Sequence, residues 1–398
     1  MDTPQAARSP IPSRREYPQA LLGGLLALVV AMGIGRFAYT PILPLMKSEA
    51  GVSDAFAGVL ASGNYLGYLA GALVAALPFW RPRRVLAIRS ALVAAAVTTL
   101  AMGLVVNPFA WLGIRFVSGV ASAFVLILVS SLILDQASRE GRAWWPGVLY
   151  SGVGLGIALT GIVVPSLARD GWRAAWIGLG FMSVLLCVAI WPGLSEESAD
   201  PSRAPDAAVD APHPAIYWSL LVSYFAVGIG YIVPATFIVA ILRATPQLAP
   251  IASSSWIIVG LIAAPSPFVW GRLALRFGRI PMLGLAMLLL TAGVLAPVFV
   301  PNVAGATFAA LALGGTFIGI TTLVTIEARA LFPHSSHRAI GQLTAAFGVG
   351  QVIGPLIVSA IASAGGNYDT ALLAAGSILL AGCAILAAGQ FVGKRAAG

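Results

Sequence analysis

The segment VVAMGIGRFAYTPILPLM, Val29 to Met46, decides the fold, because it places one cation, Arg36, deep inside an apolar run. The run begins near Ala20, so a helix rising about 1.5 Å per residue puts Arg36 roughly 24 Å from that end. A charge at such depth in a bilayer costs about 3 kcal/mol, and it usually faces a polar interior on a ligand or ion path. The segment therefore predicts a membrane helix that carries a functional arginine.

The composition of the whole chain is that of a membrane protein. Of its 398 residues, 59% are hydrophobic and 9% are charged, whereas soluble domains carry about a quarter charged residues. Apolar stretches recur, each long enough to cross a hydrocarbon layer of about 30 Å as a helix. Twelve such helices are expected, at residues 20–46, 54–79, 84–105, 108–134, 143–168, 172–193, 216–242, 250–274, 279–300, 303–328, 338–364 and 368–392.

The positive charges are distributed unevenly between the ends of these stretches. Of the 23 Lys and Arg residues, 17 fall on the side of the N-terminus, four on the far side, and two, Arg36 and Arg115, within spans. Lys and Arg concentrate on the cytoplasmic side of membrane proteins. We therefore expect a multi-pass protein of a bacterial inner membrane with both termini in the cytoplasm. The net charge of +9 reflects this topology and indicates no nucleic-acid partner.

The chain repeats itself after about 195 residues. Gly33-Ile34-Gly35 returns as Gly228-Ile229-Gly230, and Tyr231 then stands at the position of Arg36. Repeats of this size indicate a fold built from two similar units. A polar stretch rich in Pro, Ala and Asp separates the units and is typical of a flexible linker. We predict an N-terminal six-helix half at 1–194, a cytoplasmic linker at 195–214 and a C-terminal six-helix half at 215–398.

Several motifs resemble those of the major facilitator superfamily. GRLALRFGR, Gly271 to Arg279, is similar to the family's loop motif G-x-L-A-D-R-x-G-R, with Leu275 in place of the Asp. In the first-half copy, Phe79 stands at the Asp position. The sequence R-x-x-S-G-x-x-x-A, which starts at Arg115, is similar to the embedded-arginine motif of proton-coupled members.

The string GIGRFAYTPILPLM resembles the YbfB/YjiJ-type branch of that superfamily. The resemblance covers essentially the whole chain. It implies an all-α membrane protein with twelve transmembrane helices in two pseudo-symmetric six-helix halves. It also implies a monomer with a substrate path between the halves, near the bilayer midplane.

Two arginines lie at membrane depth. Arg36, with Thr40 on the same helical face and Tyr39 beside them, is interpreted as a substrate-binding group, since a guanidinium in a low-dielectric cavity binds a carboxylate or phosphate bidentately. The alternative is an arginine tied to neighbouring carbonyls that fixes the first helix. For Arg115, a hydrogen bond to the first helix, interfacial snorkelling and a role in coupling are all open.

Acids within spans are scarce. Of 14, Asp135 and Glu327 are interpreted as the two that touch a span at its cytoplasmic end, in corresponding helices. Intramembrane carboxylates are the usual proton carriers, which makes both candidates for coupling or gating. The alternative is that each pairs with a loop arginine and latches a cytoplasmic gate. The loop arginines assigned to gating are Arg272, Arg276 and Arg279.

Polar and aromatic side chains on other spans complete the predicted substrate site. As a set they form a plausible cage, although each alone is an ordinary core or interface residue. They are Asn64, Tyr68, Tyr231, Trp256 and Gln351, beside Arg36, Tyr39 and Thr40.

Glycines at helical spacing predict close packing between spans. Small residues four apart let helix backbones approach. A phosphate-binding loop is excluded, because no strand precedes these glycines and they lie inside apolar spans. The residues assigned to packing are Gly33, Gly35, Gly152, Gly154, Gly350, Gly354 and Pro355.

These features predict a secondary transporter that moves a small organic molecule, with an organic anion favoured, by alternating access. Its expected partners are that substrate and the lipid bilayer, and protons if transport is coupled to them. We expect no cofactor, no metal site and no enzyme activity, since the spans contain no metal-ligand cluster and no nucleophile–base set. Two alternatives remain: a multidrug or metabolite efflux pump without an anion requirement, in which Arg36 is structural, and a non-transporting receptor on the same fold.

Overall fold

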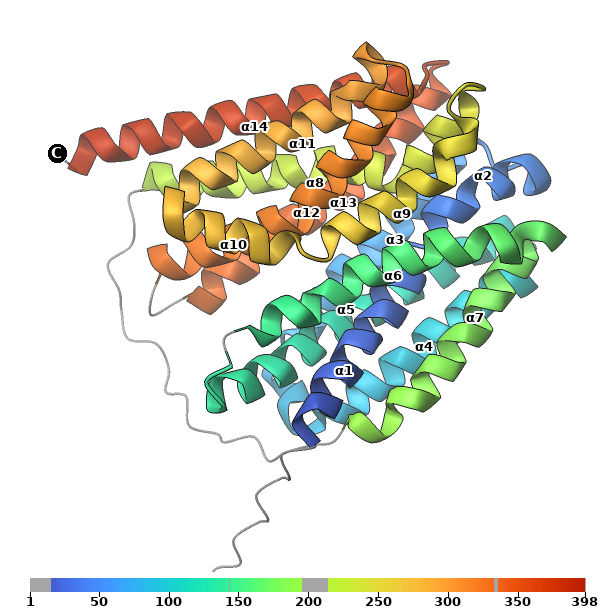
Figure 1. The fold of residues 1–398 in the computed structure, drawn as a ribbon, viewed down its shortest axis with the longest axis horizontal. Helices are drawn as coiled ribbons and strands as arrows, with labels where there is room; N and C mark the ends of the chain where they lie inside the picture. The colour runs from blue at the N-terminus through green and yellow to red at the C-terminus, as the bar shows by residue number, and fades with distance from the viewer. Residues whose placement is uncertain (1–15, 143, 195–213, 333–335, 398) are drawn as a thin grey trace, which may run out of the picture.

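The computed structural model describes residues 16–142, 144–194, 214–332 and 336–397, and those residues contain helices and no strand. Of the predicted linker, all but Pro214 lies outside the described residues. In Figure 1 the helices up to α7 lie together, and those from α8 onward lie beside them. We call these two groups the first half and the second half.

The first half consists of α1 (Glu16–Leu28), the π-helix η1 (Val29–Ile34), α2 (Tyr39–Ala50), α3 (Asp54–Ala75), η2 (Pro78–Arg83), α4 (Arg84–Leu104), α5 (Pro108–Arg139), α6 (Trp145–Leu167), η3 (Ala168–Asp170), α7 (Gly171–Ile190) and η4 (Trp191–Gly193). The second half consists of α8 (Pro214–Ala244), η5 (Ala249–Ile251), α9 (Ala252–Ala263), α10 (Ser266–Phe277), α11 (Arg279–Phe299), α12 (Val303–Leu331), α13 (Ser336–Ser363) and α14 (Tyr368–Ala397).

The twelve predicted spans are accounted for by these helices. Ten stretches are long and apolar enough to cross a membrane, and α9 with α10, bent by 47°, makes an eleventh. Pro265 lies at this bend and supplies no backbone N–H, so the helix cannot continue regularly through it. The longest stretch, Trp145–Gly193, contains both α6 and α7, which fold back on each other at η3 (Figure 1).

The first span is not the continuous helix that the sequence predicted. It breaks into α1, η1 and α2, with a turn at residues 35–38. Pro41 has no backbone N–H, so the Phe37 carbonyl accepts instead from the Thr40 amide at 3.2 Å. Thr40 would be the α-helical donor to the Arg36 carbonyl. The break therefore leaves the Arg36 carbonyl without a backbone donor, so that its hydrogen bond must come from outside the first span.

The two halves use the same local structure at matching places. Asn107 caps α5 by accepting hydrogen bonds from two backbone amides, and Asn302, 195 residues later, caps α12 in the same way. Arg84 begins α4, and Arg279, again 195 residues later, begins α11. An uncapped helix end buried in a bilayer would leave backbone donors without partners. The repeat thus extends to the residues that end and start the helices.

Helix pairs that join the halves are α3 with α13, α6 with α9, α2 with α8 and, less extensively, α6 with α10. Side-chain hydroxyls donate to backbone carbonyls across this boundary, from Thr40 to Ala235 at 2.7 Å and from Ser62 to Val352 at 2.8 Å. In a bilayer such polar contacts replace much of the hydrophobic driving force that is missing between apolar helices.

A charged cluster links the two halves where α2 ends and α3 and α14 begin. Lys47, in the last turn of α2, lies 2.5 Å from Asp54 at the start of α3. The hydroxyl of Tyr368, which begins α14, accepts from Lys47 and donates to Asp54. One ion pair of the first half is therefore tied to the second half.

Except for Gly35, the predicted packing residues lie where two helices approach each other closely. A Cβ on Gly33 would come within 2.4 Å of the Gly156 backbone, and one on Gly152 within 2.5 Å of Leu25. A Cβ on Gly154 or Gly350 would lie 2.5 Å from the Ala264 backbone or 2.4 Å from the Phe225 backbone, and one on Gly354 would lie 2.4 Å from the Ile232 side chain. The Pro355 carbonyl would lie 2.4 Å from a Cβ on Gly58. For Gly35 the closest atom is the Ala31 carbonyl oxygen of its own span, at 2.8 Å.

Gly119→Ala should destabilise the protein, whereas Gly113→Ala on the same helix should not. A Cβ at Gly119 would lie 2.0 Å from the Asn64 carbonyl oxygen, whereas one at Gly113 meets open space. Forcing α3 away from α5 should cost about 1–3 kcal/mol. Thermal unfolding in detergent should show a midpoint several degrees lower for Gly119→Ala alone. Equal midpoints for the two variants would contradict the close approach.

Candidate functional site

Arg36 lies inside a cage of aromatic rings between the first span and α3. Its side chain belongs to the turn at residues 35–38, and the residue is only 2% exposed. The guanidinium carbon lies 4.1 Å from the ring centre of Tyr68, 4.8 Å from that of Tyr65 and 5.4 Å from that of Phe37. Aromatic faces attract a cation, and the attraction strengthens when water is excluded. The cage therefore stabilises a buried positive charge without neutralising it.

One edge of this guanidinium has no partner among the described residues. Both Nε and Nη2 of Arg36 are buried and lack a hydrogen-bond acceptor. These two N–H groups point the same way and form the edge that grips a carboxylate with two parallel hydrogen bonds. Buried donors without acceptors are rare in folded proteins and call for an explanation. A bound anion would supply the missing acceptors.

The second half faces this cage with a stack of parallel rings. Phe317 and Tyr231 stack at 5.8 Å between ring centres, Tyr231 and Phe347 at 5.3 Å, and Phe347 and Tyr224 at 4.5 Å. Phe37 joins the cage to this stack, since its ring lies 6.4 Å from that of Phe317. Side chains of both halves therefore surround one polar centre.

Tyr231 and Gln351 add polar groups to the stack. The Gln351 amide donates to the Tyr231 hydroxyl, and its own Oε1 is buried without a partner among the described residues. Tyr231 occupies the position that Arg36 occupies in the first half. Trp256 lies at the edge of the site, with its ring 6.3 Å from Phe37 and its indole N–H bonded to Thr160 of α6.

Three residues of the predicted cage turn away from Arg36. Tyr39 donates to the Ala57 carbonyl, Thr40 to Ala235, and the Asn64 amide to the Arg115 carbonyl, at 3.0, 2.7 and 2.9 Å. Thr40 is thereby bound to α8, and its place on a common face with Arg36 remains a prediction. These three side chains join helices to one another.

Arg115 braces the broken first span. Its Nη1 and Nη2 groups donate to the carbonyls of Gly35 and Arg36, at 3.2 and 3.4 Å, and Ser118 donates to the Gly35 carbonyl at 2.8 Å. Among the alternatives open for Arg115, the structure thus contains the hydrogen bond to the first helix. Since the donors reach the turn that carries Arg36, they also fix the position of the cage.

The two intramembrane acids form ion pairs within their own halves. Asp135 lies 2.7 Å from Arg84, and Glu327 lies 2.6 Å from Arg279. The burial is reversed between the pairs, since Arg84 and Glu327 are each 7% exposed whereas their partners are each 46% exposed. Neither pair bridges the halves, so neither acts as a latch between them in this structure. The other two predicted gating arginines, Arg272 and Arg276, are exposed and make no ion pair with a described carboxylate.

A family model described as "Uncharacterised MFS-type transporter YbfB" matches residues 28–387. The chain belongs to this YbfB family of MFS-type transporters.

Among curated proteins, an MFS-type transporter of Yersinia pestis is 26% identical over 196 residues, which cover 45% of this chain and 50% of that protein. A gentisate transporter of Corynebacterium glutamicum is 24% identical over 46% of this chain and 40% of its own length. A chloramphenicol resistance protein of Streptomyces lividans is 33% identical over 41% of each chain. The chain thus matches about half the length of its curated relatives, or less.

Two solved structures share the MFS fold over nearly the whole chain. A bacterial homologue of the human lysosomal transporter Spinster, in an inward-facing and occupied conformation, has a TM-score of 0.73 at 19% identity and covers 96% of this chain and 98% of its own. The nucleoside transporter NupG, as a mutant, has a TM-score of 0.74 at 12% identity and covers 94% of this chain and 99% of its own.

Sequence analysis of this YbfB-family chain missed two of the three rings of the aromatic cage. Tyr65 and Phe37 contact Arg36, and Phe317 and Phe347 form half of the opposite stack. Phe37 could have been found, because it directly follows Arg36 in the segment that decided the fold. The others carry no signal in the sequence that distinguishes them from ordinary core aromatics.

Arg115→Gln should lower the thermal unfolding midpoint more than Ser118→Ala does. The first variant loses charge-assisted bonds to two freed carbonyls, at a cost of about 1.5–3 kcal/mol, and the second loses one neutral bond to one of them, at about 1 kcal/mol. Both contacts end on the same turn, so Ser118→Ala is the matched control. Equal midpoints would show that Arg115 does not brace the first span.

Proposed function

We propose that this protein is a secondary active transporter of small organic anions, and that Arg36 binds the anionic group. The observation that carries the proposal is the unpartnered Nε–Nη2 edge of Arg36, buried in an aromatic cage at the boundary of the halves. A carboxylate is the simplest acceptor with two oxygens at the right spacing for that edge. The aromatic walls favour an apolar or aromatic body behind it.

The relatives agree with this substrate class without fixing it. The gentisate transporter is named for an aromatic carboxylate, which combines the two features that the site could recognise. The chloramphenicol resistance protein supports the rival, efflux of a drug without an anion requirement. The two functions differ in what they require of Arg36, since a neutral cargo leaves its free edge unpaired.

The contacts between the halves support alternating access. The halves meet through close backbone approaches and a few polar bonds, which lets them rock against each other without loss of their own cores. The cluster of Lys47, Asp54 and Tyr368 links the halves at one end of the bundle. We propose that opening this end separates Tyr368 from the ion pair, while Lys47 and Asp54 remain together in the first half.

Arg36→Lys should reduce uptake of an aromatic carboxylate at least about tenfold, because a point charge cannot reproduce two parallel hydrogen bonds worth about 1.5–3 kcal/mol. The measurement is initial uptake of radiolabelled benzoates, gentisate among them, into proteoliposomes. Arg395→Lys, an exposed arginine over Phe391, controls for the exchange itself. Wild-type rate and affinity for the Arg36→Lys and Arg36→Ala proteins would overturn the assignment and favour the neutral-drug rival.

Glu327 is the proposed coupling residue. Glu327→Gln should abolish accumulation driven by a pH gradient and leave substrate exchange intact, because a carrier driven by protons needs a group whose charge changes in the cycle. Asp135→Asn is the matched control, from the pair with reversed burial. It should slow both modes and lower the unfolding midpoint more, because it leaves the buried Arg84 without its partner. Full gradient-driven accumulation by the Glu327→Gln protein would point to uniport or anion exchange.

A further inference from the structure

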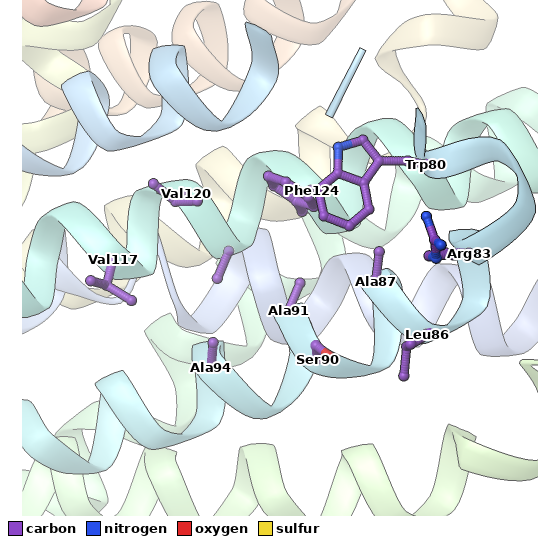
Figure 2. Close-up of a pocket in the computed structure, with 11 residues that line it drawn as sticks. Trp80, Arg83, Leu86, Ala87, Ser90, Ala91, Ala94, Val117, Val120 and Phe124 are labelled. Atoms are coloured by element: carbon purple, nitrogen blue, oxygen red, sulfur yellow. The ribbon is translucent and has the colours of Figure 1, made fainter. Parts of the chain in front are cut away.

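A groove on the membrane-facing surface of the first half is separate from the Arg36 site. It has a volume of about 350 Å³ and lies between α4 and α5 (Figure 2). Leu86 and Val117 on its rim are 65% and 47% exposed, so the groove opens outward to the surroundings of the bundle. Since these helices span a membrane, lipid surrounds this opening.

The groove is hollow because its floor is made of alanines. Ala87, Ala91 and Ala94 repeat along one face of α4, and opposite them α5 presents a stripe that includes Val120 and Phe124. Figure 2 shows the alanines in a row between Trp80 at one end and Val117 at the other. From Arg83 to Ala94 a helix rises about 16 Å, which is half of a hydrocarbon core of about 30 Å. The length of the groove along α4 is therefore about the thickness of one leaflet, which is the length of one acyl chain.

The mouth of the groove is basic and rigid. Arg83 is exposed, lies with its guanidinium 4.6 Å from the ring centre of Phe79, and makes no ion pair with a described carboxylate. Trp80 stacks edge-on against both Phe79 and Phe124 at 5.1 Å. No acidic residue lines the groove. Phe79, which stands where the loop motif has an acid, keeps negative charge away from Arg83.

We propose that this groove binds one anionic phospholipid of the cytoplasmic leaflet, with its phosphate at Arg83 and one acyl chain along the alanine floor. Arg83 begins the span on the side where the sequence concentrates positive charge, which is the side of anionic headgroups in most membranes. A basic residue at that surface is worth about a fivefold preference for an anionic headgroup. This inference does not depend on the proposed transport function.

The test is native mass spectrometry of the detergent-purified protein with equimolar phosphatidylglycerol and phosphatidylcholine of identical chains. The wild-type protein should retain phosphatidylglycerol about fivefold over phosphatidylcholine. Arg83→Gln should reduce this ratio to about one, and Arg83→Lys should preserve it, because a lysine still binds a phosphate as a point charge. Ala94→Phe should fill the groove and remove the first retained lipid of both kinds.

Arg395→Gln is the matched control, because Arg395 is also exposed and lies 4.2 Å from the Phe391 ring but does not line this groove. It should keep the wild-type ratio. Glycerol phosphate, which carries the phosphate without chains, should not compete, and competition would assign the site to a free phosphate. An unchanged ratio in Arg83→Gln, a retained first lipid in Ala94→Phe, or no preference in the wild-type protein would each overturn the proposal.

Discussion

The break in the first span is the constraint on which the site depends. Pro41 withdraws a backbone donor, the turn at 35–38 replaces a helical turn, and the freed carbonyl of Arg36 needs a partner inside the membrane. Arg115 supplies it from α5, together with a bond to Gly35. Arg115 therefore donates hydrogen bonds to these backbone carbonyls. The guanidinium of Arg36 lies instead against the Tyr65 and Tyr68 rings of α3.

The two halves share a scaffold and differ at its centre. Helix ends are repeated faithfully, as at Asn107 and Asn302, because each half faces the same problem of satisfying its backbone in lipid. The centre departs from the repeat, since the counterpart of Arg36 in the second half is Tyr231. A symmetric pair of arginines would repel, and a symmetric pair of tyrosines would hold no charge. The departure creates one cation opposite one aromatic wall, which suits a ligand with a charged end and an apolar body.

The spans, the repeat and the superfamily could be predicted from sequence, because hydrophobic length, glycine spacing and loop charge are properties of contiguous residues. The geometry around Arg36 could not. Helical spacing predicted Thr40 on the same face as Arg36. Pro41, the next residue, changes the local backbone, and the Thr40 hydroxyl donates a hydrogen bond to the Ala235 carbonyl. Asp135 and Glu327 pair with arginines, as the gate alternative predicted, but each pair lies inside one half. In the first half this happens because α4, which carries Arg84, packs against α5, which carries Asp135. Contacts between distant segments decided both outcomes.

The unpaired Nε–Nη2 edge of Arg36 destabilises the protein without ligand. Under the proposed function, the same edge makes binding selective for an anion. Each ring of the cage offers a buried cation about 2 kcal/mol, while removing an ion from water costs several kcal/mol even after relaxation. The rings attract the charge, but Nε and Nη2 have no hydrogen-bond acceptor among the described residues. A neutral ligand of the same shape would leave that deficit in place, and sites with unpaired buried donors reject such ligands strongly. Under the proposed function, discrimination between an acid and its amide would follow from this unpaired edge, because the carboxylate brings two oxygen acceptors and the amide brings one.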